Sequence, residues 1–311
     1  MAVRLYREEQ ALVMENPGCA GAVMRRSLSL PKRPNWHRKQ RFAAPLGVLA
    51  ALLATFALPA AACGPESNCG IGERHYRIRM PAGHDGKTPV PVLLFAHGYT
   101  ATPAAVMANA GLARTIDGLG AALIAPKSAY KGWALANAPR AATRPAVDEP
   151  AFIDAVLADA ASRFSLDLGR VVASGFSSGG MMAWTLACQG GDRYAGFIPI
   201  AGTFWAPVPS DCPARPASLV HLHGDADQTV PLDGRAIADT RQGRVADALS
   251  LFARHGGFGL PEPVRNGHLR CQKRTNAAGL VLAFCLYPGG HGFAPEDIPY
   301  AWGLIMGSGR N

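Results

Sequence analysis

The chain has 311 residues, of which 49% are hydrophobic and 17% charged, with 35 Gly and 25 Pro. This composition is typical of a compact, loop-rich globule and excludes a disordered chain. The net charge of +9 is concentrated near the start, because nine of the 31 Lys/Arg and three of the 22 Asp/Glu lie in residues 1–62. The other 22 basic and 19 acidic residues leave a charge near +3. That balance gives no electrostatic case for nucleic-acid binding.

The first segment has the pattern of an export leader, which we place at residues 1–62. Basic residues precede an apolar run at 45–62, and the run ends in three alanines of the kind that signal peptidase requires. Pro59 interrupts the run before it is long enough to cross a bilayer, so we expect cleavage and no stable membrane span in the mature form. Met24 opens a leader of more usual length and is an alternative start.

We therefore expect a secreted protein, either extracellular or periplasmic. An N-terminal membrane anchor is one alternative. Lipid attachment at Cys63 is another, but Ala60 stands where a lipid-attachment signal usually has Leu. Both alternatives fit the sequence less well than cleavage after the three alanines.

The remaining chain alternates between strands and helices, and it has the length of one ordinary domain. Several of the expected strands are continuous apolar runs, which is typical of strands buried on both faces. This order predicts an α/β fold with a mostly parallel sheet and helices on both faces. The expected elements are strand 75–80, strand 90–95, helix 102–116, strand 121–126, helix 149–164, strand 170–174, helix 178–188, strand 197–200, strand 219–222, helix 244–254 and strand 280–287.

Seven cysteines are present, and one of them lies in the leader. The other six form an even set in an exported chain, where thiols tend to oxidise in pairs. Six cysteines allow 15 pairings, and we expect the three short-range ones. A zinc site would need C-x-x-C spacing, which does not occur, so no metal is expected. The expected disulfides are Cys63 with Cys69, Cys188 with Cys212, and Cys271 with Cys285.

The sharpest motif is Gly175-Phe176-Ser177-Ser178-Gly179, which follows an apolar strand and precedes a helix. A serine hydroxyl can attack an ester only if it stands exposed on a tight turn beside a base, and the flanking glycines permit that turn. The start of the following helix directs free N–H groups to the place where an oxyanion would form. Ser177 is thus the candidate nucleophile, and a plain Gly/Ser turn is the alternative.

On such a scaffold the acid and the base follow the nucleophile in the order Ser, Asp/Glu, His. The acid is expected in a polar loop after a buried strand, where we choose Asp227 over its neighbour Asp225. The base is expected at His291, in a glycine-rich loop after the last apolar run, where an imidazole can reach both partners. His255 at a helix end and His268 in a turn are the other downstream histidines.

An oxyanion hole needs two backbone N–H donors. The first is the N–H of Ser178, the residue after the nucleophile. The second is expected from the loop after the early strand, where the N–H of Tyr99 is the candidate. His97 in the same loop has no assigned proton to move, so we interpret it as a residue that holds the loop.

With these residues in place, the chain resembles the polyhydroxybutyrate depolymerase family of secreted esterases, which includes feruloyl-esterase-like members. The likeness covers roughly residues 63–293. It implies a single α/β-hydrolase catalytic domain at 63–311, no cofactor, and a triad of Ser177, Asp227 and His291. The motifs that carry it are Phe95-Ala96-His97-Gly98, Ser174-Gly175-Phe176-Ser177-Ser178-Gly179-Gly180-Met181-Met182, Ile200-Ala201-Gly202-Thr203-Phe204-Trp205, His221-Leu222-His223-Gly224 with Asp227, and Gly289-Gly290-His291.

The resemblance implies hydrolysis of carboxylic esters, such as hydroxyalkanoate oligomers or other short-chain esters. Family members that degrade solid polyester usually add a polymer-binding domain, whereas this chain ends about twenty residues after His291. We therefore expect soluble oligomers or small esters as substrates. Phe176, Trp133 and Trp205 are candidates for lining the substrate pocket, and ordinary core packing is the alternative for each.

Other functions fit the same motifs. A feruloyl or acetylxylan esterase acting on plant cell-wall esters is the first alternative, and a serine peptidase is the next. The alternative from another class is a non-catalytic binding protein of hydrolase fold. Such a protein would normally lack a triad member, and this sequence has all three in order.

Overall fold

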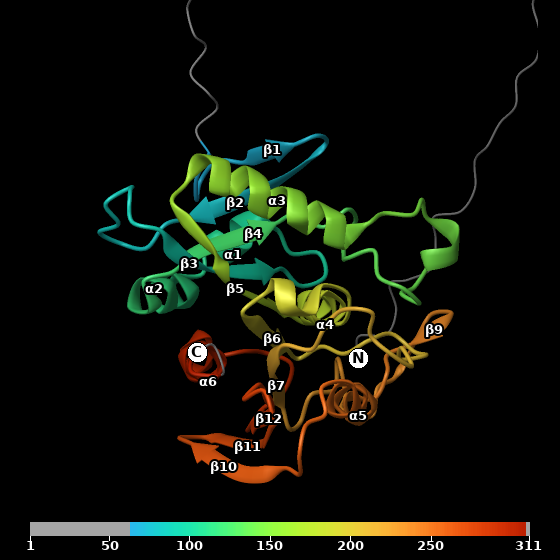
Figure 1. Ribbon diagram of the computed structural model, residues 1–311. Helices are drawn as coiled ribbons and strands as arrows, with labels where there is room; N and C mark the ends of the chain where they lie inside the picture. Colours follow the sequence, from blue (N-terminus) through green and yellow to red (C-terminus); the bar gives the residue numbers. More distant parts are fainter. Residues whose placement is uncertain (1–62, 309–311) are drawn as a thin grey trace, which may run out of the picture. The chain divides into compact units, whose positions relative to one another are not determined.

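The computed structural model describes residues 63–308 (Figure 1). The expected leader at 1–62 and the alternative start at Met24 lie outside these residues. Among the described residues, no helix is both long and apolar enough to span a membrane.

A ten-stranded sheet forms the centre of the described chain, and its six middle strands pair in parallel. Antiparallel strands extend it on both sides. The strands are β1 (Cys69–Ile71), β2 (Arg74–Arg79), β3 (Val90–Ala96), β4 (Ala122–Pro126), β5 (Leu166–Phe176), β6 (Gly196–Ile200), β7 (Ser218–Gly224), β10 (Glu262–Asn266), β11 (Leu269–Thr275) and β12 (Val281–Tyr287), in the spatial order β1-β2-β4-β3-β5-β6-β7-β12-β11-β10. A separate hairpin pairs β8 (Ala236–Ile237) with β9 (Thr240–Arg241).

Helices cover both faces of the sheet (Figure 1). One face packs against α3 (Glu149–Arg163), α4 (Ser178–Gly190) and α5 (Val245–His255). The other packs against α1 (Pro103–Met107), α2 (Ala110–Leu119) and α6 (Ile298–Met306). Each layer buries a continuous apolar cluster, so the expected α/β class and helix placement are confirmed. Three short 3₁₀ turns complete the described elements, at Ala141–Thr143, Gly191–Arg193 and Pro295–Asp297.

The expectation of one helix over 102–116 is wrong, because the structure has two helices there. The side chain of Thr102 caps the first, accepting from the Ala105 N–H at 3.2 Å. Asn109 interrupts the pattern and caps the second, accepting from the Leu112 N–H at 3.0 Å. A short polar side chain that competes for helical N–H groups ends one helix and starts the next.

The three expected disulfides are present in the structure. Cys63 is bonded to Cys69, and the other two bonds join residues 188 with 212 and 271 with 285. A lipid thioether at Cys63 would need the same sulfur atom that this disulfide uses.

Parallel pairing brings the carboxyl ends of β3, β5, β7 and β12 to one edge of the sheet. In open α/β sheets the loops beyond these ends form the ligand crevice. The residues expected to act together are all in those four loops.

Candidate active site

Ser177 lies on the tight turn between β5 and α4. Its backbone has φ 58° and ψ −118°, a conformation that L residues rarely adopt and that costs roughly 1–3 kcal/mol. The turn is held by the Ser177 N–H, which donates to the Ile200 carbonyl at 2.9 Å. Its hydroxyl does not cap α4. The strained turn thus presents a hydroxyl that the helix does not use.

Glycines allow this turn to pack against β3. A Cβ atom at Gly179 would lie 1.8 Å from the Ala96 carbonyl oxygen, and one at Gly175 would lie 2.4 Å from the Gly179 oxygen. Only glycine fits at such close backbone approaches. The start of α4 consequently lies directly against the end of β3.

Asp227 and His291 come together across 64 residues of sequence. The Nδ1–H of His291 donates to Asp227 Oδ2 at 2.7 Å, which leaves Nε2 with its lone pair. The other carboxylate oxygen accepts from the N–H groups of Thr229 and Val230, both at 2.8 Å. This is the contact by which an acid orients a catalytic imidazole.

The Asp227 side chain is fully buried. Burial raises the pKa of its carboxyl, but hydrogen bonds from two imidazoles and from the Val230 N–H outweigh that effect. The net result is a pKa well below the usual range, so the carboxylate is ionised at neutral pH and stabilises a charged His291.

A buried histidine that the sequence argument did not single out as a site residue, His223, lies behind the acid. His223 donates from Nε2 to the Val230 carbonyl at 2.8 Å, and the same atom is 3.4 Å from Asp227 Oδ2. Its Nδ1 faces His221 Nε2 at 2.9 Å. The sequence held one signal for this role. His223 lies two residues after His221 in the strand before Asp227, and alternate strand residues point to the same face.

The alternatives to Asp227 and His291 have other partners. Asp225 pairs with Arg270 at 2.6 Å and accepts from the Gly289 N–H at 3.1 Å, so it braces the histidine loop. His255 bonds the Ala214 carbonyl at 2.8 Å. His268 bonds Asp297 at 3.1 Å.

The ring of Phe176, the residue directly before Ser177, packs against the imidazole of His291. The Phe176 ring centroid lies 4.8 Å from the imidazole centroid and 5.1 Å from that of Phe293. Among residues 63–308, no hydrogen bond joins the Ser177 hydroxyl to His291. In unliganded enzymes such bonds are often long and tighten only when substrate binds.

The side chains of Ser178 and Tyr99, whose backbone N–H groups are the candidate oxyanion donors, both lie close to Gly132. A Cβ atom at Gly132 would lie 3.1 Å from both the Ser178 Oγ and the Tyr99 Cδ2 atoms. Tyr99 is 61% exposed. The neighbouring His97 is buried and bonds Gly98 and Ser128, which confirms its interpretation as a residue that holds the loop.

Of the three candidate substrate-binding aromatics, Phe176 packs against His291, a member of the candidate triad. Trp133 is 4% exposed and donates from Nε1 to the His97 carbonyl at 2.9 Å, so it supports the oxyanion loop. Trp205 lines a hollow of about 60 Å³ together with Thr185. Thr185 lies eight residues along α4 from Ser177, or roughly 12 Å.

Comparisons with known proteins agree with this fold. No protein-family model matches the chain. The NocK esterase of Nocardia uniformis subsp. tsuyamanensis is 28% identical over 263 residues, covering 76% of this chain and 75% of the relative. Feruloyl esterase C of Emericella nidulans is 26% identical over 244 residues, covering 73% and 80%. The structure of an acetyl xylan esterase from Aspergillus awamori superposes with a TM-score of 0.56 at 15% identity, covering 78% and 96%.

The structural similarity shows that the fold is that of the α/β-hydrolases. Together with the esterase relatives, it identifies the chain as a carboxylic ester hydrolase.

Proposed function

We propose that this chain is a secreted serine esterase whose catalytic triad is Ser177, His291 and Asp227. The observation that carries the proposal is the 2.7 Å hydrogen bond from His291 to a buried carboxylate, at the sheet edge where Ser177 occupies a strained strand-to-helix turn. This arrangement supplies a nucleophile, a base and an orienting acid in the order typical of the fold.

The proposed reaction is acyl transfer in two halves. Nε2 of His291 takes the Ser177 proton while Oγ attacks the ester carbonyl, and the N–H groups of Ser178 and Tyr99 stabilise the oxyanion. His291 then gives the proton to the departing alcohol, leaving an acyl-serine. Water, deprotonated by the same imidazole, releases the acid and restores Ser177.

For the substrate we favour soluble esters with a hydroxyl-bearing alcohol. Beside His291 lies a hollow of about 370 Å³ whose lining includes the imidazole of His268 and the buried carboxylate of Asp297. These groups can exchange hydrogen bonds with hydroxyls of the leaving group. Relatives named as feruloyl esterases support an aryl acyl group, and the polyhydroxybutyrate depolymerase motifs support hydroxyalkanoate oligomers as the second candidate.

The test of the mechanism is the initial rate on p-nitrophenyl butyrate. We expect Ser177→Ala to lose several orders of magnitude in kcat, as triad variants do. Ser162→Ala, on the exposed side of α3, is the matched control and should retain the wild-type rate. Equal activity of the wild type and Ser177→Ala would refute Ser177 as the nucleophile, and no activity in either would favour the non-catalytic alternative.

A substrate panel then separates the candidates. Methyl ferulate, acetylated xylose and hydroxybutyrate trimer should be compared by kcat/KM. We expect acetylated xylose, whose alcohol carries free hydroxyls, to be preferred if the hollow beside His291 receives the alcohol, whereas methyl ferulate, which releases methanol, tests the aryl acyl group alone. A preference for the trimer would instead support the hydroxyalkanoate assignment.

Export is the remaining part of the proposal. Three disulfides support an oxidising compartment, because such bonds are rare in the cytosol. N-terminal sequencing of the secreted protein should find cleavage near Ala62.

A further inference from the structure

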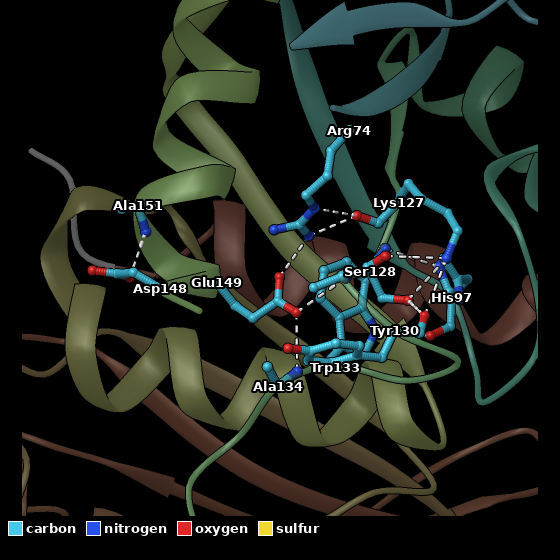
Figure 2. A network of polar contacts seen from close by, with 11 residues as sticks. Arg74, His97, Lys127, Ser128, Tyr130, Trp133, Ala134, Asp148, Glu149 and Ala151 are labelled. Atoms are coloured by element: carbon cyan, nitrogen blue, oxygen red, sulfur yellow. Dashed lines mark hydrogen bonds and ion pairs between the residues drawn. The ribbon is translucent and has the colours of Figure 1, made fainter. Parts of the chain in front are cut away.

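We propose that the buried ion pair of Glu149 with Arg74 is a positioning device for the oxyanion hole, acting through the loop at residues 127–134. This inference rests on the proposed function. Figure 2 shows the network, which runs from Glu149 on α3 to His97 in the loop after β3.

The network starts from a carboxylate that has no contact with solvent. Glu149 is the first residue of α3 and is 0% exposed. It accepts from Arg74 Nη2 at 2.6 Å, from the Ala134 N–H at 2.9 Å and from the Ala129 N–H at 3.3 Å. A buried charge is tolerated only when it is paired and hydrogen-bonded in this way. Glu149 thus fixes two amides of one loop.

The arginine fixes a third point of the same loop. Nε and Nη2 of Arg74 donate to the Lys127 carbonyl oxygen at 3.0 and 2.6 Å. The guanidinium lies 3.4 Å from the centroid of the Phe152 ring. Because Nη2 also donates to Glu149, the rigid guanidinium links the carboxylate of Glu149 to this carbonyl. The 127–134 loop is therefore attached to β2 and α3 at both of its ends.

This loop in turn makes three hydrogen bonds to residues 97–100, the segment that contains the proposed oxyanion donor Tyr99. The Ser128 N–H donates to His97 Nε2 at 3.2 Å, and the indole of Trp133 donates to the His97 carbonyl at 2.9 Å. The Thr100 N–H donates to the Lys131 carbonyl at 2.6 Å. The residues before and after Gly98 and Tyr99 are both fixed by this one loop.

His97 completes the connection. Its Nδ1–H donates to the Gly98 carbonyl at 2.8 Å. The Gly98 oxygen and the Tyr99 N–H belong to one planar peptide group, so holding the oxygen sets the direction of the N–H. Burial first, and then nearby positive groups, lower the pKa of His97 to about 4. The ring is consequently neutral at pH 5–8, with one donor and one acceptor nitrogen.

The hydrogen bonds therefore form a continuous path from Glu149 to the proposed oxyanion donor. Glu149 touches neither substrate nor reacting atoms, and its role is to aim the Tyr99 N–H. A displacement of this donor weakens binding of the transition state, while binding of the ground-state ester is changed much less.

The test compares Glu149→Gln with Asp154→Asn. Asp154 lies on the same helix and pairs with Arg193 at 2.5 Å, but this pair is at the surface and outside the network. Rates on p-nitrophenyl butyrate are expressed per active site titrated with a fluorophosphonate. We expect Glu149→Gln to lower kcat about 10- to 100-fold, the effect of moving a catalytic donor by about 1 Å, with KM within about twofold. Asp154→Asn should keep the wild-type values.

A second measurement separates positioning from a general loss of folding. Phenylboronic acid forms a tetrahedral adduct with a serine hydroxyl and so depends on the oxyanion donors. Its affinity should fall in parallel with kcat in Glu149→Gln, and the pH profile of kcat/KM should stay unchanged because His291 and Asp227 are untouched. If Glu149→Gln does not fold, Trp133→Phe removes the donor to His97 and should show the same pattern.

Two results would overturn the inference. One is a Glu149→Gln enzyme with the kcat of Asp154→Asn per titrated site. The other is a loss confined to the number of titratable sites, with unchanged boronate affinity, which would indicate a purely structural role. An inactive wild-type protein would instead refute the proposed function.

Discussion

Replacing Gly179 by alanine tests whether the contact between α4 and β3 sets the geometry of the candidate site. An added Cβ would lie 1.8 Å from the Ala96 carbonyl oxygen, whereas real Cβ atoms essentially never come within 3.0 Å of such an atom. The start of α4 must therefore move away from β3 by roughly 1 Å. The proposed donors Ser178 and Tyr99 lie on opposite sides of this contact, so they would separate.

The expected magnitude follows from two opposing effects. Alanine in a helix is more favourable than glycine by about 1 kcal/mol. Forcing an extra methyl group into a packed interior costs about 1–3 kcal/mol, so the free energy of unfolding should fall by up to about 2 kcal/mol. A displacement of about 1 Å at catalytic groups lowers kcat about 100-fold.

The assay combines urea unfolding with initial rates on p-nitrophenyl butyrate, and Gly303→Ala is the control. Gly303 lies inside α6, and a Cβ there meets no atom within 4 Å. This variant should be up to about 1 kcal/mol more stable than the wild type and equally active. If Gly179→Ala shared the stability and kcat of Gly303→Ala, the contact between α4 and β3 would not control the site.

Two further predictions concern stability. Because the folded-state pKa of Asp227 is lowered, its ionised form contributes stability above the unfolded pKa of about 4, and this is lost as pH falls through the lower folded value. The stability difference between wild type and Asp227→Asn, from urea unfolding at pH 7, 5 and 3, should therefore shrink at pH 3; a constant difference would contradict the assignment. Replacing both Cys188 and Cys212 by Ser opens a loop of 24 residues and should cost about 3.5 kcal/mol, against about 2 kcal/mol for the six-residue loop of Cys63 and Cys69. The reverse order in urea unfolding would show that loop entropy is not the main contribution.

The sequence predicted the candidate site best where a local structural pattern and a chemically suitable residue fall at the same position. The strand-turn-helix context of Ser177 predicted a tight turn, and the structure has one with a positive φ at that residue. The choice of Asp227 over Asp225 rested on a loop position, and the structure places Asp227 against His291 and Asp225 against Arg270. Alternation of buried strands and helices was sufficient for the fold class.

Long-range polar contacts could not be predicted from the sequence. Glu149 has the features of an ordinary acidic residue in the first turn of a helix, which is usually exposed. Its burial depends on Arg74, which is 75 residues earlier and carries no pattern that connects the two. The β10–β11 hairpin was also missed, because polar residues dominate these strands and obscure the alternation expected of a half-buried strand.

The two outer strands of the sheet affect whether this protein can associate with other chains through its sheet edges. Within residues 63–308, one border is β1, only three residues long and anchored by the Cys63–Cys69 disulfide. The other is β10, which contains Pro263 together with the charged Glu262 and Arg265 and is largely exposed. Proline lacks an N–H, and charged or very short border strands pair poorly with foreign strands. Both borders thus discourage edge-to-edge aggregation, which would otherwise be a hazard for a concentrated protein with so large a sheet.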